Sequence, residues 1–309
     1  MAALAAWAFL ALRVLPELRT RPAVRRDLVR PLFAFSGWLG LSSILYAVTS
    51  SMDRLVIGSL ITVAAVAFYS APYEAINRIG VVPASLSMVL FPAFSYLDAG
   101  GRRREVEALF ARSVKFLLLS TGPVFVVLIF FARPLLRLWL GADFAAESAF
   151  AVRVLAAGFL VNTVVAVPNN YLIGIGRVDV APKYQAAELV LFTAATWAGA
   201  KLAGIDGVAA VAAVRLAAFS VFLLAVSFTA GGVPFGYVWK NGFAGVAAAL
   251  ALLAVGLAAS TALGGGFWGA GALLAAFAAA TWARVLTSDE RAFLLGLLRR
   301  SRPSPEAAA

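Results

Sequence analysis

Long apolar segments alternate with short clusters of arginine and lysine through almost the whole chain. An apolar helix of about 20 residues is long enough to cross the hydrocarbon core of a bilayer. The composition agrees with this pattern, because 62% of the residues are hydrophobic and only 13% are charged, against about 25% charged in soluble domains. The sequence therefore predicts an all-α fold, a polytopic membrane helix bundle.

About nine transmembrane helices fit into the chain. The stretch from residue 31 to residue 97 has basic residues on both flanks, which predicts an even number of crossings, and four would each be too short. We expect two long helices there, with a turn at Ile61–Val63, an outer connector at Ala132–Glu147 and a later turn at Gly204–Gly207. The expected spans are Ala2–Leu15, the two helices within Pro31–Leu97, Ser113–Phe131, Ala149–Ile173, Ala186–Leu202, Val208–Phe228, Gly242–Ala262 and Phe267–Ala283.

The basic residues also predict the orientation. Of the 26 lysines and arginines, 18 fall in the segments assigned to the inner side and three in the outer connectors. Positive charge concentrates in cytoplasmic loops, so we expect the N-terminus outside and the C-terminus in the cytoplasm. These loops account for the net charge of +11 and indicate affinity for anionic lipids, not for nucleic acid.

Several classes of chemistry lack their residues. The chain has no cysteine and no histidine, which excludes disulfides, thiol catalysis, haem and most zinc sites. It also lacks the GxxxxGK[ST] nucleotide loop, HExxH and GxSxG. We therefore expect no catalytic residue, no cofactor and no metal, and a protein that is not an enzyme.

Four charged residues lie inside otherwise apolar sequence on the first long hairpin: Asp53, Arg54, Glu74 and Arg78. With the turn near residue 62, the two pairs overlap in depth, so Asp53 could pair with Arg78 and Arg54 with Glu74. One interpretation is the lining of a cavity for anionic, sugar-bearing cargo. The alternative is a self-neutralised network that holds two helices together.

Two arginines, Arg153 and Arg215, have no acidic neighbour in their own spans. Arginine can bind phosphate through two parallel hydrogen bonds, so both are candidate substrate-binding residues. The alternative is that they snorkel to the membrane surface or pair with a carboxylate of another span.

Three further residues are candidates for function. Glu188 could carry a coupling ion, or it could meet Arg177 or Lys183 at the membrane surface. Asn169 and Asn170 follow a proline, where a bend frees backbone carbonyls. They could hydrogen-bond sugar hydroxyl groups, or they could cap the inner end of a helix.

A set of short motifs resembles the C-terminal lobe of polysaccharide flippases, the Wzx-like, RfbX-type members of the multidrug/oligosaccharidyl-lipid/polysaccharide exporter superfamily. The similarity covers roughly residues 31 to 228 and includes no single diagnostic motif. The motifs are Phe35-Ser36-Gly37, Asp53 to Gly58, Ala67 to Ser70, Leu90 to Ala93, Gly141 to Phe144 and the Gly204 to Gly207 turn.

The resemblance implies a fold and a function. It implies a MATE-like transporter of two six-helix lobes in the bacterial inner membrane, with lipid-linked oligosaccharide as the cargo and alternating access as the mechanism. Residues 31–228 would be the second lobe, residues 1–30 the last helix of a largely missing first lobe with a basic connector, 229–286 an added hairpin and 287–309 a basic cytoplasmic tail.

Because most of the first lobe is missing, we expect either a truncated or partial chain or a second polypeptide that supplies the missing half. The alternatives are a multidrug or cation antiporter of the same superfamily and a non-transporting membrane subunit of an envelope-glycan assembly complex.

Overall fold

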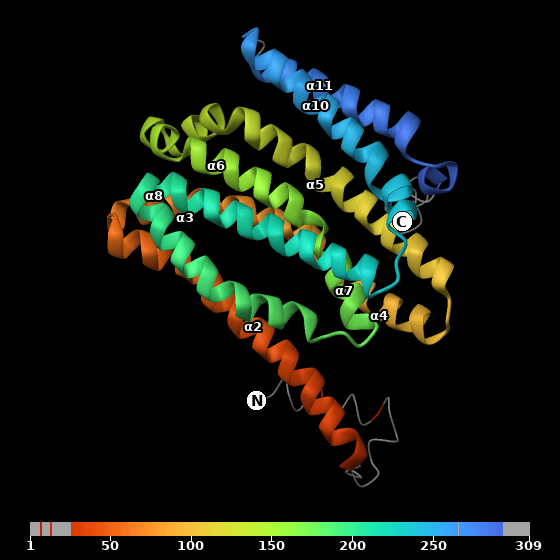
Figure 1. The fold of residues 1–309 in the computed structure, drawn as a ribbon. Helices are drawn as coiled ribbons and strands as arrows, with labels where there is room; N and C mark the ends of the chain where they lie inside the picture. Colours follow the sequence, from red (N-terminus) through yellow and green to blue (C-terminus); the bar gives the residue numbers. More distant parts are fainter. Residues whose placement is uncertain (1–6, 8–12, 14–25, 265, 293–309) are drawn as a thin grey trace.

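The computed structural model describes Trp7, Arg13 and residues 26–264 and 266–292, and this part of the chain contains helices and no strands (Figure 1). The elements, in chain order, are α2 (Arg26–Leu60), α3 (Val63–Asn77), η2 (Arg78–Gly80), α4 (Val81–Ala99), α5 (Arg103–Leu140), α6 (Ala142–Asn162), η3 (Thr163–Val165), α7 (Ala166–Gly174), α8 (Val180–Thr229), α9 (Phe235–Val238), η4 (Trp239–Phe243), α10 (Ala244–Ala262), α11 (Gly266–Ala280) and η5 (Thr281–Val285).

Within the described residues, seven helices are long and apolar enough to cross a membrane, which confirms the polytopic helix bundle. One of them, α8, folds back on itself: Ala203 and Gly204 leave helical geometry, and Gly204 adopts a φ of 59°. The predicted turn at Gly204–Gly207 therefore lies inside a hairpin (Figure 1). The expected span Ala2–Leu15 falls largely outside the described residues, so the count of nine stays a prediction.

The first hairpin turns where the sequence predicted. Helix α2 ends at Leu60, and Thr62 begins α3 by accepting a hydrogen bond on its hydroxyl oxygen from the Ala65 N–H at 3.0 Å. A threonine at this position satisfies an N–H group that would otherwise lack a partner in the first helical turn. The Ile61–Val63 turn is therefore confirmed.

Prolines explain three interruptions of the long helices. A proline lacks an N–H and clashes with the carbonyl four residues earlier. Pro83 accordingly lies after the 3₁₀ segment η2, and the residue four positions before it, Ile79, lies within that segment. Pro168 lies after the 3₁₀ segment η3 in the same way, with Val164 four positions before it. Pro134 follows the kink of α5 at Phe131, where φ is −108° and ψ is 18°. A kinked helix can continue beyond the bend.

That kink corrects one expectation. The segment Ala132–Glu147, expected to be an outer connector, is helical except at Gly141. Helix α5 continues through its kink to Leu140, and α6 begins at Ala142. Gly141 makes this abrupt junction with a φ of 95°, a conformation that favours glycine.

The helices pack in a row (Figure 1). Helix α2 lies against α8 at one end, α6 packs between α8 and α5, and the hairpin of α10 and α11 lies on the other side of α5. One core cluster joins α3, α6 and the second arm of α8, and another joins α4, α5, α7 and α10.

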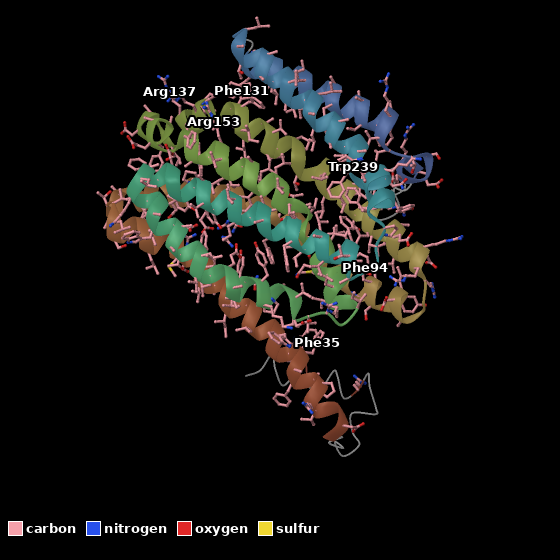
Figure 2. The ribbon with its side chains drawn as sticks, in the orientation of Figure 1. Phe35, Phe94, Phe131, Arg137, Arg153 and Trp239 are labelled. Carbon is pink, nitrogen blue, oxygen red and sulfur yellow. The ribbon has the colours of Figure 1, made fainter. Side chains whose placement is uncertain are left out.

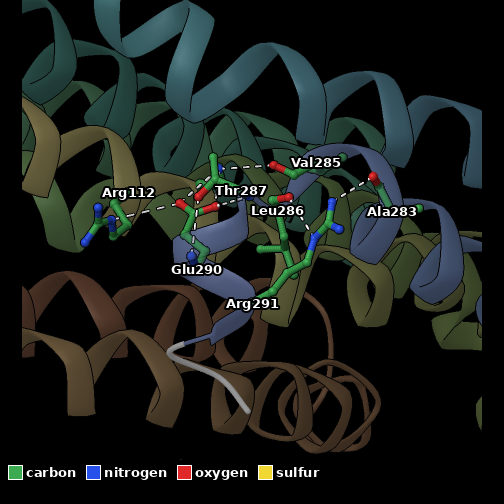
Figure 3. A network of polar contacts seen from close by, with 8 residues as sticks. Arg112, Ala283, Val285, Leu286, Thr287, Glu290 and Arg291 are labelled. Carbon is green, nitrogen blue, oxygen red and sulfur yellow. Dashed lines mark hydrogen bonds and ion pairs between the residues drawn. The ribbon is translucent and has the colours of Figure 1, made fainter. Parts of the chain in front are cut away.

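A buried ion pair fastens the end of the last hairpin to α5 (Figure 3). The ammonium group of Lys115 on α5 lies 2.7 Å from Oε2 of Glu290 and also donates to the carbonyl of Val285 at 3.2 Å. Glu290 in turn accepts from the N–H of Thr287, so it also caps the short helix that contains it. Both partners are buried, with side-chain exposures of 8% for Lys115 and 6% for Glu290.

We predict that Lys115→Met releases this segment. It would leave the buried Glu290 carboxylate unpaired, which costs about 3 kcal/mol. Trypsin should then cleave the native protein after Arg291 about 100-fold faster, because that free energy holds the segment closed. Arg112→Gln is the control, since Arg112 is exposed and 3.9 Å from Glu290, a pair worth at most about 1 kcal/mol. Equal cleavage rates in the two variants would contradict the prediction.

The same pair gives the segment an acid dependence. Burial alone raises the pKa of Glu290, but hydrogen bonds from Lys115 and Thr287 outweigh it, and the pKa lies below its usual range. A lowered pKa contributes stability above the unfolded value, which is lost as the pH falls through the folded value. The segment should therefore stay docked at neutral pH and loosen below about pH 4.3, the ordinary value for glutamate.

Candidate functional site

Polar side chains meet between α2, α3 and α8 in a cluster that we call the polar seam: Asp53, Arg54, Tyr69, Tyr73, Glu74 and Arg215. Arg54 on α2 forms an ion pair with Glu74 on α3, and its guanidinium carbon lies 5.9 Å from the ring centre of Tyr73. The hydroxyl of Tyr69 donates to Oδ2 of Asp53 at 2.7 Å. The seam therefore joins α2 and α3, the two helices of the first hairpin.

Only one of the two expected cross-pairs forms. Arg54 meets Glu74, but Asp53 bonds to Tyr69, and Arg78 is exposed in η2 with no ion pair to any described residue. Adjacent residues on a helix point about 100° apart. The side chains of Asp53 and Arg54 therefore leave α2 in different directions and reach different residues of α3.

Asp53 is the most deeply buried charged residue of the seam, with 2% of its surface exposed. Its second oxygen, Oδ1, is buried without a hydrogen-bond partner in the described structure. A buried carboxylate oxygen that lacks a partner is costly, so a hydrogen-bond donor from a water molecule or a ligand would be stabilised at this position.

Arg215 enters the seam from the second arm of α8. Its guanidinium carbon lies 4.7 Å from the ring centre of Phe192 on the first arm, and its Nε is buried without a hydrogen-bond partner among the described residues. Arg215 also lies close enough to Asp53 and Glu188 to act on both electrostatically. One arginine thus faces carboxylates on two different helices.

Glu188 lies on the first arm of α8, half-buried, and has no ion pair or hydrogen bond within the described chain. The expected alternative partners do not reach it, because Lys183 bonds to Asp179 at 2.5 Å and Arg177 lies 3.8 Å from the same carboxylate. The hydrogen bond from Lys183 lowers the pKa of Asp179 below its usual range. Both basic residues that were expected to pair with Glu188 therefore pair with Asp179 instead.

A polar pocket of about 560 Å³ lies between α2, α7 and the beginning of α8. Its polar lining is Ser42, Ser43, Tyr46, Asn169, Arg177 and Gln185. Tyr46 also lies within electrostatic range of Tyr73 in the polar seam. Ser42 and Asp53 are eleven residues apart on α2, which places them on one face and about 16 Å apart along the helix. The pocket and the seam therefore follow one side of α2.

The two asparagines differ in their surroundings. Asn169 lines the polar pocket. Asn170 is buried and donates to Ser87 at 2.9 Å and to the Ala166 carbonyl at 2.7 Å, which ties α7 to α4. The donors of Asn170 are thus used inside the protein, one within α7 and one between α7 and α4, and not at the end of a helix.

The structure does not bring Arg153 to the seam. Arg153 is exposed on α6 and forms no ion pair within the described residues (Figure 2). Its contact with a cargo stays a prediction that is separate from the seam.

Sequence reasoning missed the uncharged members of this region, Tyr46, Tyr69, Tyr73 and Gln185. The available signals were spacings: Tyr69 and Tyr73 are four residues apart and so lie on one face of α3, and Gln185 is one turn before Glu188. Among the described residues, no group of three or more acidic side chains is arranged to hold a metal ion.

Fold and site together define a multi-pass helical membrane protein with ionisable side chains inside its bundle. A model of the family described as "Polysaccharide biosynthesis protein" matches residues 3–149. A protein of Shigella flexneri named "Putative O-antigen transporter" is 28% identical over 179 residues, 58% of this chain and 42% of that protein. No solved structure shows a significant match.

These matches confirm the resemblance to polysaccharide flippases, since residues 3–149 are similar to that family of polysaccharide biosynthesis proteins. The aligned region covers less than half the length of the Shigella protein.

Proposed function

We propose that this chain takes part in moving lipid-linked oligosaccharide across the bacterial inner membrane by alternating access. The observation that carries the proposal is the continuous polar side of α2, from the polar pocket to the polar seam, inside a bundle that is otherwise apolar. Sugar hydroxyl groups and phosphates need hydrogen-bond partners at membrane depth, and intramembrane ionisable residues commonly mark such pathways. The similarity to an O-antigen transporter favours a glycan as the cargo.

The proposed roles follow from position. Arg215, with Asp53, Arg54, Glu74 and Arg78, would meet the phosphate and acidic groups of the cargo, and Asn169 its hydroxyl groups. Arg153 and Asn170 remain proposed contacts with less support, since neither faces the pocket or the seam. These are binding roles, so we propose transport and no catalysis.

We also propose the domain division given by the sequence: a six-helix lobe over residues 31–228, an added hairpin over 229–286 and flanking segments at both ends. A second polypeptide that supplies the missing first lobe is part of the same proposal. The proposed orientation has the C-terminus in the cytoplasm.

Glu188 is the proposed coupling residue, and we predict that Glu188→Gln uncouples transport. A half-buried carboxylate without an ion pair can gain and lose a proton, whereas the amide cannot. In inverted membrane vesicles with a fluorescent lipid-linked oligosaccharide, the extra flipping driven by an imposed pH gradient should disappear, while gradient-free exchange persists. Glu147→Gln, at an exposed carboxylate near the start of α6, is the control. A full gradient response in Glu188→Gln would refute the coupling role.

A further inference from the structure

An apolar groove of about 800 Å³ lies between the lobe and the added hairpin. One wall comes from α5, α6 and the second arm of α8, and the other from α9, η4 and α10; residues of the two walls include Leu118 and Phe130 on α5 and Ala251 on α10. No charged side chain lines it. An empty space of this size would forfeit the dispersion contacts that a packed interior makes. In a bilayer, the acyl chain of a lipid can fill this space.

Four aromatic rings in successive contact form one end of the apolar groove, the first pair edge to face and the other two pairs stacked. Phe228 and Phe235 lie 5.3 Å apart, Phe235 and Trp239 5.9 Å, and Trp239 and Phe243 6.2 Å, as distances between ring centres. Trp239 lies where η4 meets α5 (Figure 2). Half of the Trp239 surface is exposed, and exposed tryptophans are typical of the level of lipid headgroups.

Two cations stand at this same end. Lys240, beside Trp239, is exposed and forms no ion pair within the part of the chain that the structure describes. Arg103 donates to the Gly231 carbonyl at 3.1 Å, in the segment between Phe228 and Phe235, and likewise has no ion pair to a described carboxylate. The segments at this end of the apolar groove thus carry two cations, of which Arg103 has the carboxylates Asp98 and Glu107 in its surroundings and Lys240 has no ion pair to a described residue.

We propose that the apolar groove holds one anionic phospholipid of the bilayer, with its acyl chain in the groove and its phosphate at Lys240 and Arg103. Acyl chains gain little by leaving one apolar surface for another, so the headgroup must supply the selectivity. The positive charge of these cations favours an anionic headgroup over a zwitterionic one. A lipid in this position would join the hairpin of α10 and α11 to the lobe.

Native mass spectrometry of the purified full chain tests this proposal with dioleoylphosphatidylglycerol and dioleoylphosphatidylcholine as probes. One phosphatidylglycerol should be retained about tenfold more tightly than phosphatidylcholine, since each basic residue near a headgroup contributes about 1 kcal/mol. Lys240→Gln should lower that preference about fivefold. Equal retention of the two lipids by the unaltered chain would overturn the proposal.

A matched pair of tryptophan variants locates the site. Ala251→Trp places a large ring in the apolar groove and should weaken phosphatidylglycerol binding at least about tenfold. Ala248→Trp lies on the same helix, exposed and outside the groove, and should leave binding unchanged. Equal retention by both variants would refute the location. Full displacement of phosphatidylglycerol by an equal concentration of undecaprenyl phosphate would instead overturn the proposed occupant, because the groove would then hold a polyprenyl phosphate. Thermal melting checks that both variants fold, and Lys240→Gln tests the site without altering the groove.

Discussion

Replacing Arg215 with alanine should reduce flipping of lipid-linked oligosaccharide about 100-fold, which corresponds to about 2.7 kcal/mol. Removing one member of a desolvated set of charges costs about 2–5 kcal/mol, because the charges left behind lose their compensation. Arg215 is the basic residue that faces both Asp53 and Glu188. Its loss would leave the Asp53 carboxylate, which already has one unpaired oxygen, still less compensated.

Two further variants make this result specific. Arg215→Lys keeps the charge but loses the planar, two-pronged donor, so it should recover only part of the activity. Arg153→Ala removes an exposed arginine away from the polar seam and should change flipping less than about threefold, in line with ordinary surface substitutions. The measurement is the rate of appearance of fluorescent cargo on the opposite face of membrane vesicles, at matched protein insertion. A large loss in Arg153→Ala with none in Arg215→Ala would reverse the assignment.

Gly207→Ala should produce the largest loss of stability among the glycine substitutions in the α8 hairpin. The two arms of α8 approach most closely at Gly199 and Gly207, where a Cβ on Gly207 would overlap the Gly199 carbonyl. Because backbone atoms stand in the way, the arms must separate, at a cost of about 3 kcal/mol. The same separation would move Arg215, on the second arm, away from α2.

A glycine without neighbours supplies the control. Gly40 lies inside α2, and a Cβ there meets nothing within 4 Å. Gly40→Ala should therefore stabilise the helix by about 0.5–1 kcal/mol, because alanine has the higher helix propensity. Unfolding of the full chain in micelles, followed by tryptophan fluorescence, measures both changes. A neutral Gly207→Ala would show that the arms are not in contact in the membrane.

The two substitutions address different levels of the structure. Arg215→Ala removes a charged side chain from the polar seam, so flipping should fall about 100-fold even when it is expressed per folded molecule. Gly207→Ala alters the backbone packing that positions the seam and should lower stability and flipping together. A variant series measured by both methods therefore separates a binding role from a supporting one.

The sequence determined the features that depend on the chain's own periodicity and local chemistry. Membrane helices followed from runs of apolar residues, the turn at Ile61–Val63 from the spacing of basic flanks, and the reversal at Gly204 from its glycines. The prolines of α4, α5 and α7 also act locally, through the carbonyl four residues earlier. The continuation of α5 to Leu140 was missed because a kink and a connector look alike in sequence.

Only the tertiary structure decided which charges meet. Asp53 and Arg54 are adjacent, yet one contacts Tyr69 and the other Glu74, because neighbouring residues on a helix point in different directions. Arg153 and Arg215 look alike in sequence, since each is a lone arginine in an apolar span. Helix rotation and the order of packing leave Arg153 exposed and turn Arg215 towards two carboxylates. Both depend on contacts between helices far apart in the chain, which no local pattern records.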